Sequence, residues 1–171
     1  FKFLKKPTQP IPPAQWNATL QRLQELRLLE HDASTGRLAA HPLLREYFAA
    51  TLSKHQPEAW QEGHRRLYQQ LKDSVPHRPE GLAGLQALYQ AVEHGCRAGL
   101  YQQALTEVYF DRILRGTGES DGYYSANKLG AFGADLGAVA CFFAEPWQRL
   151  VPGLPAAIQA WLLSVAAFHL R

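Results

Sequence analysis

One histidine, His41, stands where a predicted hairpin ends and an amphipathic helical pattern begins. Pro42 follows it, and the fixed φ and missing N–H of proline suit the first turn of a helix. A histidine at a helix start can place a ring N–H beside an anion that the free backbone amides already favour. His41 is therefore a candidate for binding an anion. The plainer alternative, that His41 only caps the helix or packs beneath the preceding segment, stays open.

Two local patterns position this histidine. The stretch 28–40 reads strand, turn, strand, because apolar residues flank a polar loop in which Gly36 can supply a positive φ. Helical patterns lie on both sides, with apolar residues at three- and four-residue steps: Trp16, Leu20, Leu23 and Leu26 before, and Leu44, Tyr47, Phe48 and Leu52 after. The order helix, hairpin, helix predicts a winged helix.

The run that begins Ala40-His41-Pro42 and continues Leu-Leu-Arg-Glu-Tyr-Phe resembles the winged-helix subdomain of the STAND regulatory ATPases, which include the NB-ARC proteins. In that class a Met-His-Asp motif opens a helix at this place, and its histidine contacts the β-phosphate of bound ADP. Only the histidine matches here, since Ala40 and Pro42 depart from the motif. The resemblance therefore implies a nucleotide contact for His41 alone.

The rest of the chain predicts helix after helix. Pro57 starts a third helix, in whose apolar stripe His64 reads as a hydrogen-bonded core residue, and a proline-rich break follows at 76–81. The heptapeptide that begins Gly99-Leu100-Tyr101 and ends Ala104-Leu105 resembles the turn of a tetratricopeptide repeat. There the glycine allows a tight turn and the alanine a close helix approach. Further apolar stripes follow: Leu82 to Cys96, Tyr101 to Leu114, Leu129 to Phe143 and Ile158 to Phe168.

The predicted fold is thus mainly α, a winged helix with a small β-hairpin followed by a tetratricopeptide-like α-solenoid of antiparallel helix pairs. We assign 1–13 to a linker or entry strand, 14–75 to the winged-helix domain with its trailing helix, and 80–171 to the helical region. The boundary lies between 56 and 80, because the third helix can pack on either side. No 34-residue period follows, so the repeats are degenerate.

Composition narrows the function classes. The chain of 171 residues is 46% hydrophobic and 19% charged, as globular domains are. Its net charge of +3 is small and scattered, which argues against nucleic acid, and no apolar run or leader suggests a membrane. Cys96 and Cys141 lie in apolar helical patterns, as reduced core thiols of a cytoplasmic protein do. The chain has no methionine, so we expect a piece of a longer protein.

No complete catalytic or metal site is expected. The chain has no Walker-type loop and no Gly-x-Ser-x-Gly elbow. His94 and Cys96 stand at i and i+2, on different faces of a helix, and lack the partners of a zinc site. Glu145-Pro146 reads as a helix end. Three glycines at 130, 133 and 137 resemble a face for close helix packing, among which Asp135 either bonds across an interface or faces solvent.

The resemblance implies a bacterial STAND ATPase as parent, with ADP or ATP held by an upstream nucleotide-binding domain of the same chain. This part would not itself be an enzyme and would hold no nucleotide alone. Its winged helix would help to keep ADP in the inactive state, and its repeats would sense a protein or other ligand. Two alternatives stay open: a winged-helix DNA-binding regulator with a helical sensor domain, and a tetratricopeptide-like protein-binding scaffold.

Overall fold

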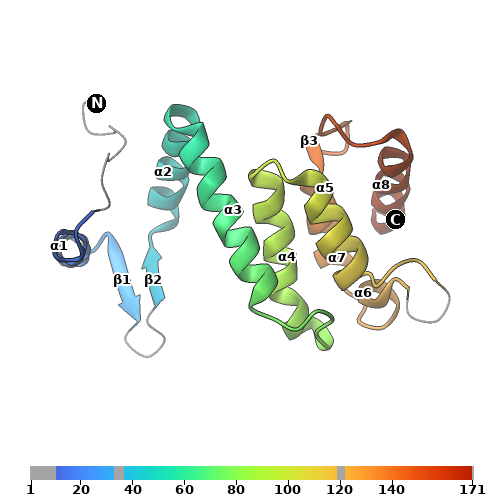
Figure 1. Ribbon diagram of the computed structural model, residues 1–171, viewed down its shortest axis with the longest axis horizontal. Helices are drawn as coiled ribbons and strands as arrows, with labels where there is room; N and C mark the ends of the chain where they lie inside the picture. The colour runs from blue at the N-terminus through green and yellow to red at the C-terminus, as the bar shows by residue number, and fades with distance from the viewer. Residues whose placement is uncertain (1–10, 33–36, 119–121, 171) are drawn as a thin grey trace. The chain divides into compact units, whose positions relative to one another are not determined.

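The structure is a computed structural model that describes residues 11–32, 37–118 and 122–170. It is mainly helical with two small antiparallel hairpins, as the coarse fold prediction requires (Figure 1). The chain forms two compact units, unit 1 at residues 1–55 and unit 2 at residues 56–171. Most of the predicted 1–13 linker and the hairpin turn with Gly36 lie outside the described residues.

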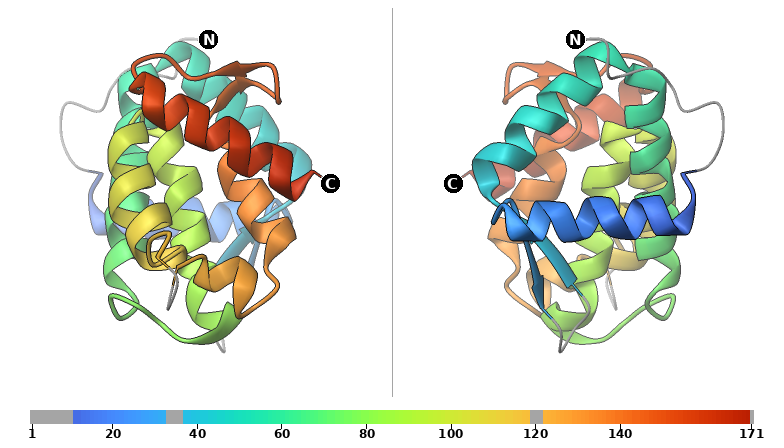
Figure 2. Two further views of the ribbon diagram at one scale, coloured as in Figure 1. Left: turned by 90° about the vertical axis from the view of Figure 1, so that its right-hand side faces the viewer. Right: turned by 90° about the vertical axis from the view of Figure 1, so that its left-hand side faces the viewer.

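Unit 1 has the predicted order of helix, hairpin and helix. It contains α1 (Pro13–Glu25), β1 (Leu29–Asp32), β2 (Arg37–Ala40) and α2 (Pro42–His55). The strands pair antiparallel from Leu29 opposite Ala40 to Asp32 opposite Arg37, and α1 lies crosswise to them (Figure 2). Both helices begin with a proline in the first turn, where the missing N–H costs no intrahelical hydrogen bond.

None of the described side chains of unit 1 is buried. Large apolar side chains are instead exposed on α1, β2 and α2 and in the segments beside α1 and β1: Ile11, Trp16, Leu26, Leu28, Leu38, Leu43, Tyr47 and Phe48. A module of this size buries too little surface to offset the entropy of ordering its chain. Unit 1 therefore presents apolar surface that a stable fold would have to cover.

Unit 2 begins with three helical segments that run in alternating directions (Figure 1). They are α3 (Pro57–Asp73), α4 (Gly81–Arg97) and α5 (Tyr101–Gln103), which continues into the π-helical segment η1 (Ala104–Ile113). The third helix, which the sequence assignment of 14–75 placed with the winged helix while leaving the boundary open between 56 and 80, packs on α4 and lies in unit 2. Beyond η1 come α6 (Tyr124–Asn127), α7 (Phe132–Ala140), β3 (Phe143–Glu145), β4 (Arg149–Leu150) and α8 (Ala156–His169).

The core of unit 2 is centred on α4. Its stripe Leu85, Leu88 and Val92 is fully buried, because these residues recur at three- and four-residue steps on one face of the helix. Residues of η1, α7 and α8 complete this core: Leu105, Val108, Tyr109, Ile113, Val139 and Leu162, with Phe142 after α7. Burial of each large side chain contributes about 1.5–3 kcal/mol.

The turn between α4 and α5 confirms a local prediction. Gly99 has a φ of +76°, which a glycine adopts without strain. A Cβ at Gly95 would stand 2.8 Å from the Cβ of Ala104, so the two helices approach closely here. The close approach of α4 and η1 therefore requires the small residues Gly95 and Ala104 at their contact.

The region after η1 departs from the prediction. The fifth helix does not run from Leu129 to Phe143: α7 ends at Ala140, and Phe143 lies in β3. Pro146 is not the residue after a helix but stands in the turn of the β3–β4 hairpin, where Trp147 has a φ of 62°. A continuous apolar run can form a helix or a buried strand with equal ease, so hydrophobic periodicity could not separate them.

Candidate functional site

His41 lies at the junction of β2 and α2, as the sequence predicts. Its backbone carbonyl accepts hydrogen bonds from the amides of Leu44 at 2.9 Å and Arg45 at 3.1 Å. Its ring Nδ1 accepts a longer hydrogen bond from the amide of Leu43, at 3.3 Å. The side chain therefore caps α2 by satisfying one of its free amides.

This cap leaves the other ring nitrogen available. A neutral imidazole whose Nδ1 accepts a hydrogen bond carries its proton on Nε2. The His41 side chain is exposed, so the Nε2–H group is open to solvent at the amino end of a helix. Capping and anion binding thus use different nitrogens and do not exclude one another.

The surface beside His41 is apolar. Leu43 and Tyr47 are neighbours one helical turn apart on α2 and are 69% and 56% exposed. Phe48 is 62% exposed, and its ring packs edge-on to that of Tyr47 with the centroids 5.4 Å apart. We call Leu43, Tyr47 and Phe48 the α2 apolar face. A candidate donor thus adjoins a surface suited to contact with another protein.

A DNA-binding winged helix would place α1 in the major groove. One positive charge of this helix is already paired, because Arg22 forms an ion pair with Glu25 at 3.1 Å.

Within the described residues no helix is long and apolar enough to cross a membrane. The same residues contain no group of three or more His, Cys, Asp or Glu side chains arranged to hold a metal ion.

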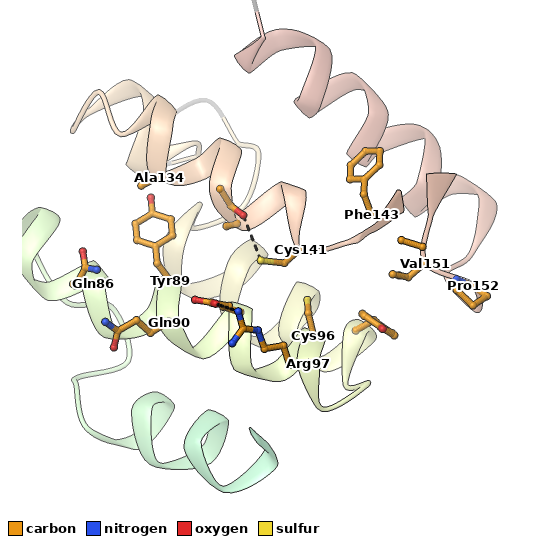
Figure 3. A pocket seen from close by; sticks show the side chains of 15 residues that line it. Gln86, Tyr89, Gln90, Cys96, Arg97, Ala134, Cys141, Phe143, Val151 and Pro152 are labelled. Carbon is orange, nitrogen blue, oxygen red and sulfur yellow. Dashed lines mark hydrogen bonds and ion pairs between the residues drawn. The ribbon is translucent and has the colours of Figure 1, made fainter. Parts of the chain in front are cut away.

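Unit 2 contains a cavity of about 680 Å³ (Figure 3). We call it the α4 pocket. Its polar wall comes from one face of α4, which contributes Gln86, Gln90, Glu93 and Arg97. Small and apolar residues of α7 and of the β3–β4 hairpin form the opposite wall: Ala134, Gly137, Ala138, Phe143 and Val151, with Pro152 after β4.

The charges in the α4 pocket compensate one another. Arg97 Nη2 lies 2.6 Å from Glu93 Oε1, one helical turn away on α4. The amides of Gln86 and Gln90 also line the pocket, and neither forms a hydrogen bond within the described part of the chain. The polar wall therefore offers uncharged donors and acceptors rather than net charge.

The glycines of α7 do not form the close packing face that the sequence suggested. A Cβ added at Gly133 or Gly137 would meet no atom within 4 Å among the described residues, so no helix lies against them. Gly130 is a turn residue with a φ of +61°. Gly137 instead keeps the apolar wall of the α4 pocket open.

A buried polar network lies behind the pocket. Asp135 is fully buried and accepts hydrogen bonds at 2.8 Å from both Tyr89 Oη and Ser125 Oγ. Burial raises the pKa of the Asp135 carboxyl, although the two hydrogen bonds oppose that shift. The sequence left open whether Asp135 bonds across an interface or faces solvent, and its burial excludes solvent exposure. Because Tyr89 also lines the pocket, the network holds that ring in place.

Two thiols face the same pocket (Figure 3). Cys96 is buried and Cys141 half-buried, and both are free, so the expectation of core thiols holds fully for Cys96 only. Burial raises the pKa of both thiols, which keeps them protonated and weakly nucleophilic at neutral pH.

The predicted core histidine is confirmed. His64 of α3 is buried, and its Nδ1 lies 2.7 Å from Nδ1 of His94 on α4. One ring must donate and the other accept, so at least one of the two Nδ1 atoms is unprotonated. Burial lowers the pKa of His64 to about 4 and lowers that of His94 as well.

The sequence did not reveal the α4 pocket. Its polar residues Gln86, Gln90, Glu93 and Arg97 recur every three or four residues, a spacing equally typical of a solvated helix face.

Comparison with protein-family models, with curated proteins and with solved structures gave no match to this chain.

Proposed function

We propose that this chain is the regulatory and protein-interaction part of a STAND-type ATPase switch. Unit 1 acts as its winged helix, and unit 2 acts as a tetratricopeptide-like sensor. The observation that carries the proposal is the exposed imidazole of His41 at the amino end of α2, with Nδ1 engaged in the cap. The Nε2–H group is then a directed donor for a phosphate oxygen, and the helix end adds a favourable partial charge.

The α2 apolar face supports the same proposal. A nucleotide-binding domain of the same polypeptide, packed on Leu43, Tyr47 and Phe48, would cover surface that is exposed here. The same packing would bring bound ADP to His41. The contact between His41 and ADP stabilises the inactive, ADP-bound state only to the extent that it is stronger in that state than in the active one.

The proposal requires a nucleotide-binding domain with a Walker-type loop upstream of this chain in the same polypeptide. The test uses that longer polypeptide. A hydrogen bond to a charged group contributes about 1.5–3 kcal/mol. His41→Ala should therefore speed ADP release by one to two powers of ten and raise signalling without a trigger. His55→Ala, at the other end of α2, is the matched control. Unchanged ADP retention in His41→Ala contradicts the proposal.

A second candidate function, a protein-binding scaffold without a nucleotide switch, is favoured by the α4 pocket. The pocket belongs entirely to unit 2, and its lining needs no residue of unit 1. The two candidates differ in what binding does. A switch couples occupation of unit 2 to ADP release, whereas a scaffold leaves nucleotide exchange unchanged.

A further inference from the structure

We propose that Cys96 and Cys141 form a disulfide bond when a peroxide enters the α4 pocket, and that this bond joins the two walls of the pocket. The inference goes beyond the nucleotide switch and concerns unit 2 alone. It is carried by the placement of two thiols in one cavity, Cys96 on α4 and Cys141 at the end of α7.

The two cysteines belong to the walls that face each other across the pocket. Cys96 is in the last turn of α4. Cys141 directly follows α7 and continues its wall of Ala134, Gly137 and Ala138 at three- and four-residue steps. Figure 3 shows the Cys96 thiol pointing from α4 toward the end of α7 that carries Cys141. Both sulfur atoms are thus directed into the same part of the cavity.

Two observations bring the cysteines within reach of each other. First, α7 packs on α4. Helices packed with their axes about 8–10 Å apart bring facing Cα atoms near the roughly 4.4–6.8 Å that a disulfide requires, because each Cα lies only about 2.3 Å from its axis. Second, the pKa of Cys96 is raised mainly by burial and further by the nearby Cys141. That second influence is electrostatic and weakens with distance.

A disulfide suits this site better than a metal ion or a thiolate does. The described residues offer no group of three or more His, Cys, Asp or Glu side chains that could hold a metal, whereas a structural zinc takes four ligands. Burial opposes ionisation of both thiols, and Glu93 opposes it further, although Arg97 favours it at Cys141. A disulfide carries no charge, so it avoids the cost of a buried thiolate.

The difference in exposure assigns the two steps of the oxidation. Cys141 is half-buried, and its thiol donates a weak hydrogen bond to the carbonyl of Gly137 at 3.4 Å. Cys96 is only 6% exposed. A peroxide that enters the pocket therefore meets Cys141 first, and Cys96 acts as the resolving thiol.

The reaction with hydrogen peroxide balances as follows. The Cys141 thiol loses its proton, and its sulfur attacks one peroxide oxygen. The O–O bond breaks, a sulfenic acid forms, and the departing hydroxide takes up the proton to become water. The Cys96 sulfur then attacks the Cys141 sulfur, the S–O bond breaks, and the Cys96 proton leaves with the hydroxide as a second water. Two thiols are oxidised to one disulfide, and one peroxide is reduced to two waters.

The experiment exposes the full reduced chain to hydrogen peroxide at about pH 8, where more thiolate is present than at neutral pH. Remaining thiols are then alkylated, and the unfolded protein is digested with trypsin without reductant. We expect one linked product, the peptide that ends at Arg97 joined to the peptide 129–149. The chain has no methionine, so thioether oxidation does not complicate the mass change.

Two matched variants separate the roles of the thiols. In Cys96→Ala the resolving thiol is absent, so Cys141 should accumulate as a sulfenic acid that dimedone traps. In Cys141→Ala the same exposure to peroxide should leave Cys96 as a free thiol, because it is buried. The wild-type digest needs neither variant, so the inference stays testable even if one of them folds poorly.

Equilibration with reduced and oxidised glutathione tests whether the fold itself brings the thiols together. The equilibrium constant for the intramolecular disulfide should be at least about tenfold larger in the folded chain than in urea, since only the fold holds the thiols close. Free thiols after peroxide, sulfinic acids without a linked peptide, a disulfide between two chains, or equal constants with and without urea would each overturn the inference. None of these measurements involves nucleotide or His41, so the nucleotide switch stands or fails separately.

Discussion

Leu43 in α2 and Leu88 in α4 are both leucines of helices, yet the first is 69% exposed and the second is fully buried. The difference recurs throughout the two units. Unit 2 encloses a continuous core, whereas unit 1 buries none of its described side chains. Unit 2 is therefore stabilised by its own packed core, whereas the described side chains of unit 1 form no such core.

The largest expected effect is the loss of a core leucine in unit 2. Leu88→Ala removes a fully buried side chain and leaves a cavity, which should lower the free energy of unfolding by about 2–5 kcal/mol. Leu43→Ala in unit 1 is the matched control and should change the free energy of unfolding by less than about 0.5 kcal/mol. Urea unfolding followed by tryptophan fluorescence compares the two. Equal effects of both substitutions would contradict the contrast between the units.

A buried arginine offers a second test of how unit 2 is held together. Arg112 of η1 is buried and donates hydrogen bonds to four backbone carbonyls, those of Lys72, Val75, Pro76 and His77. Arg112→Met would leave these carbonyls without their donor and should cost about 2–4 kcal/mol in urea unfolding.

Arg112→Lys is the control for charge alone. It retains the positive charge but not the planar set of five donors, so it should recover less than half of the loss. Full recovery by lysine would show that charge, rather than the hydrogen-bond geometry, stabilises the loop between α3 and α4.

The pair of His64 and His94 should make unit 2 sensitive to acid. Burial lowers the pKa of His64 from its ordinary 6.5 to about 4, so the unfolded chain binds a proton more readily than the folded one between these values. Stability is then complete above pH 6.5 and falls as the pH drops toward 4, by about 2–3 kcal/mol. Arg97 opposes protonation of His64 and Glu93 favours it, and both lie beside the pair on α4.

Urea unfolding at a series of pH values measures this loss. The variant His64→Leu/His94→Leu lacks both titrating rings, so its stability should vary less over the same range. A wild-type profile that stays flat from pH 7 to pH 4 would contradict the depressed pKa of His64.

The contrast between the units also explains which features the sequence could predict. Periodicity predicted α3, α4 and α8 because each has an apolar stripe with helical spacing, and it placed His64 correctly in the core. The glycine at 99 was predictable because a helix end with positive φ is a local property. Such features depend on neighbours within a few residues.

Features that depend on distant contacts were missed. The α4 pocket requires α7 and the β3–β4 hairpin to stand opposite α4, and nothing local in Gln86 or Gln90 distinguishes them from solvated residues. The partners of Asp135 lie 46 and 10 residues away in the sequence. His41 was identified only by resemblance and by its place before a proline.

The smallest expected effect tests whether the α2 apolar face is free in the isolated chain. Leu43→Ser/Phe48→Ser replaces two exposed apolar side chains, so the free energy of unfolding should change by no more than about 0.5 kcal/mol. The same variant should bind less of an apolar fluorescent dye such as ANS, because it loses exposed apolar surface. A loss of more than about 1 kcal/mol would instead show that this face is already packed in the chain, and unit 1 would then need no further partner.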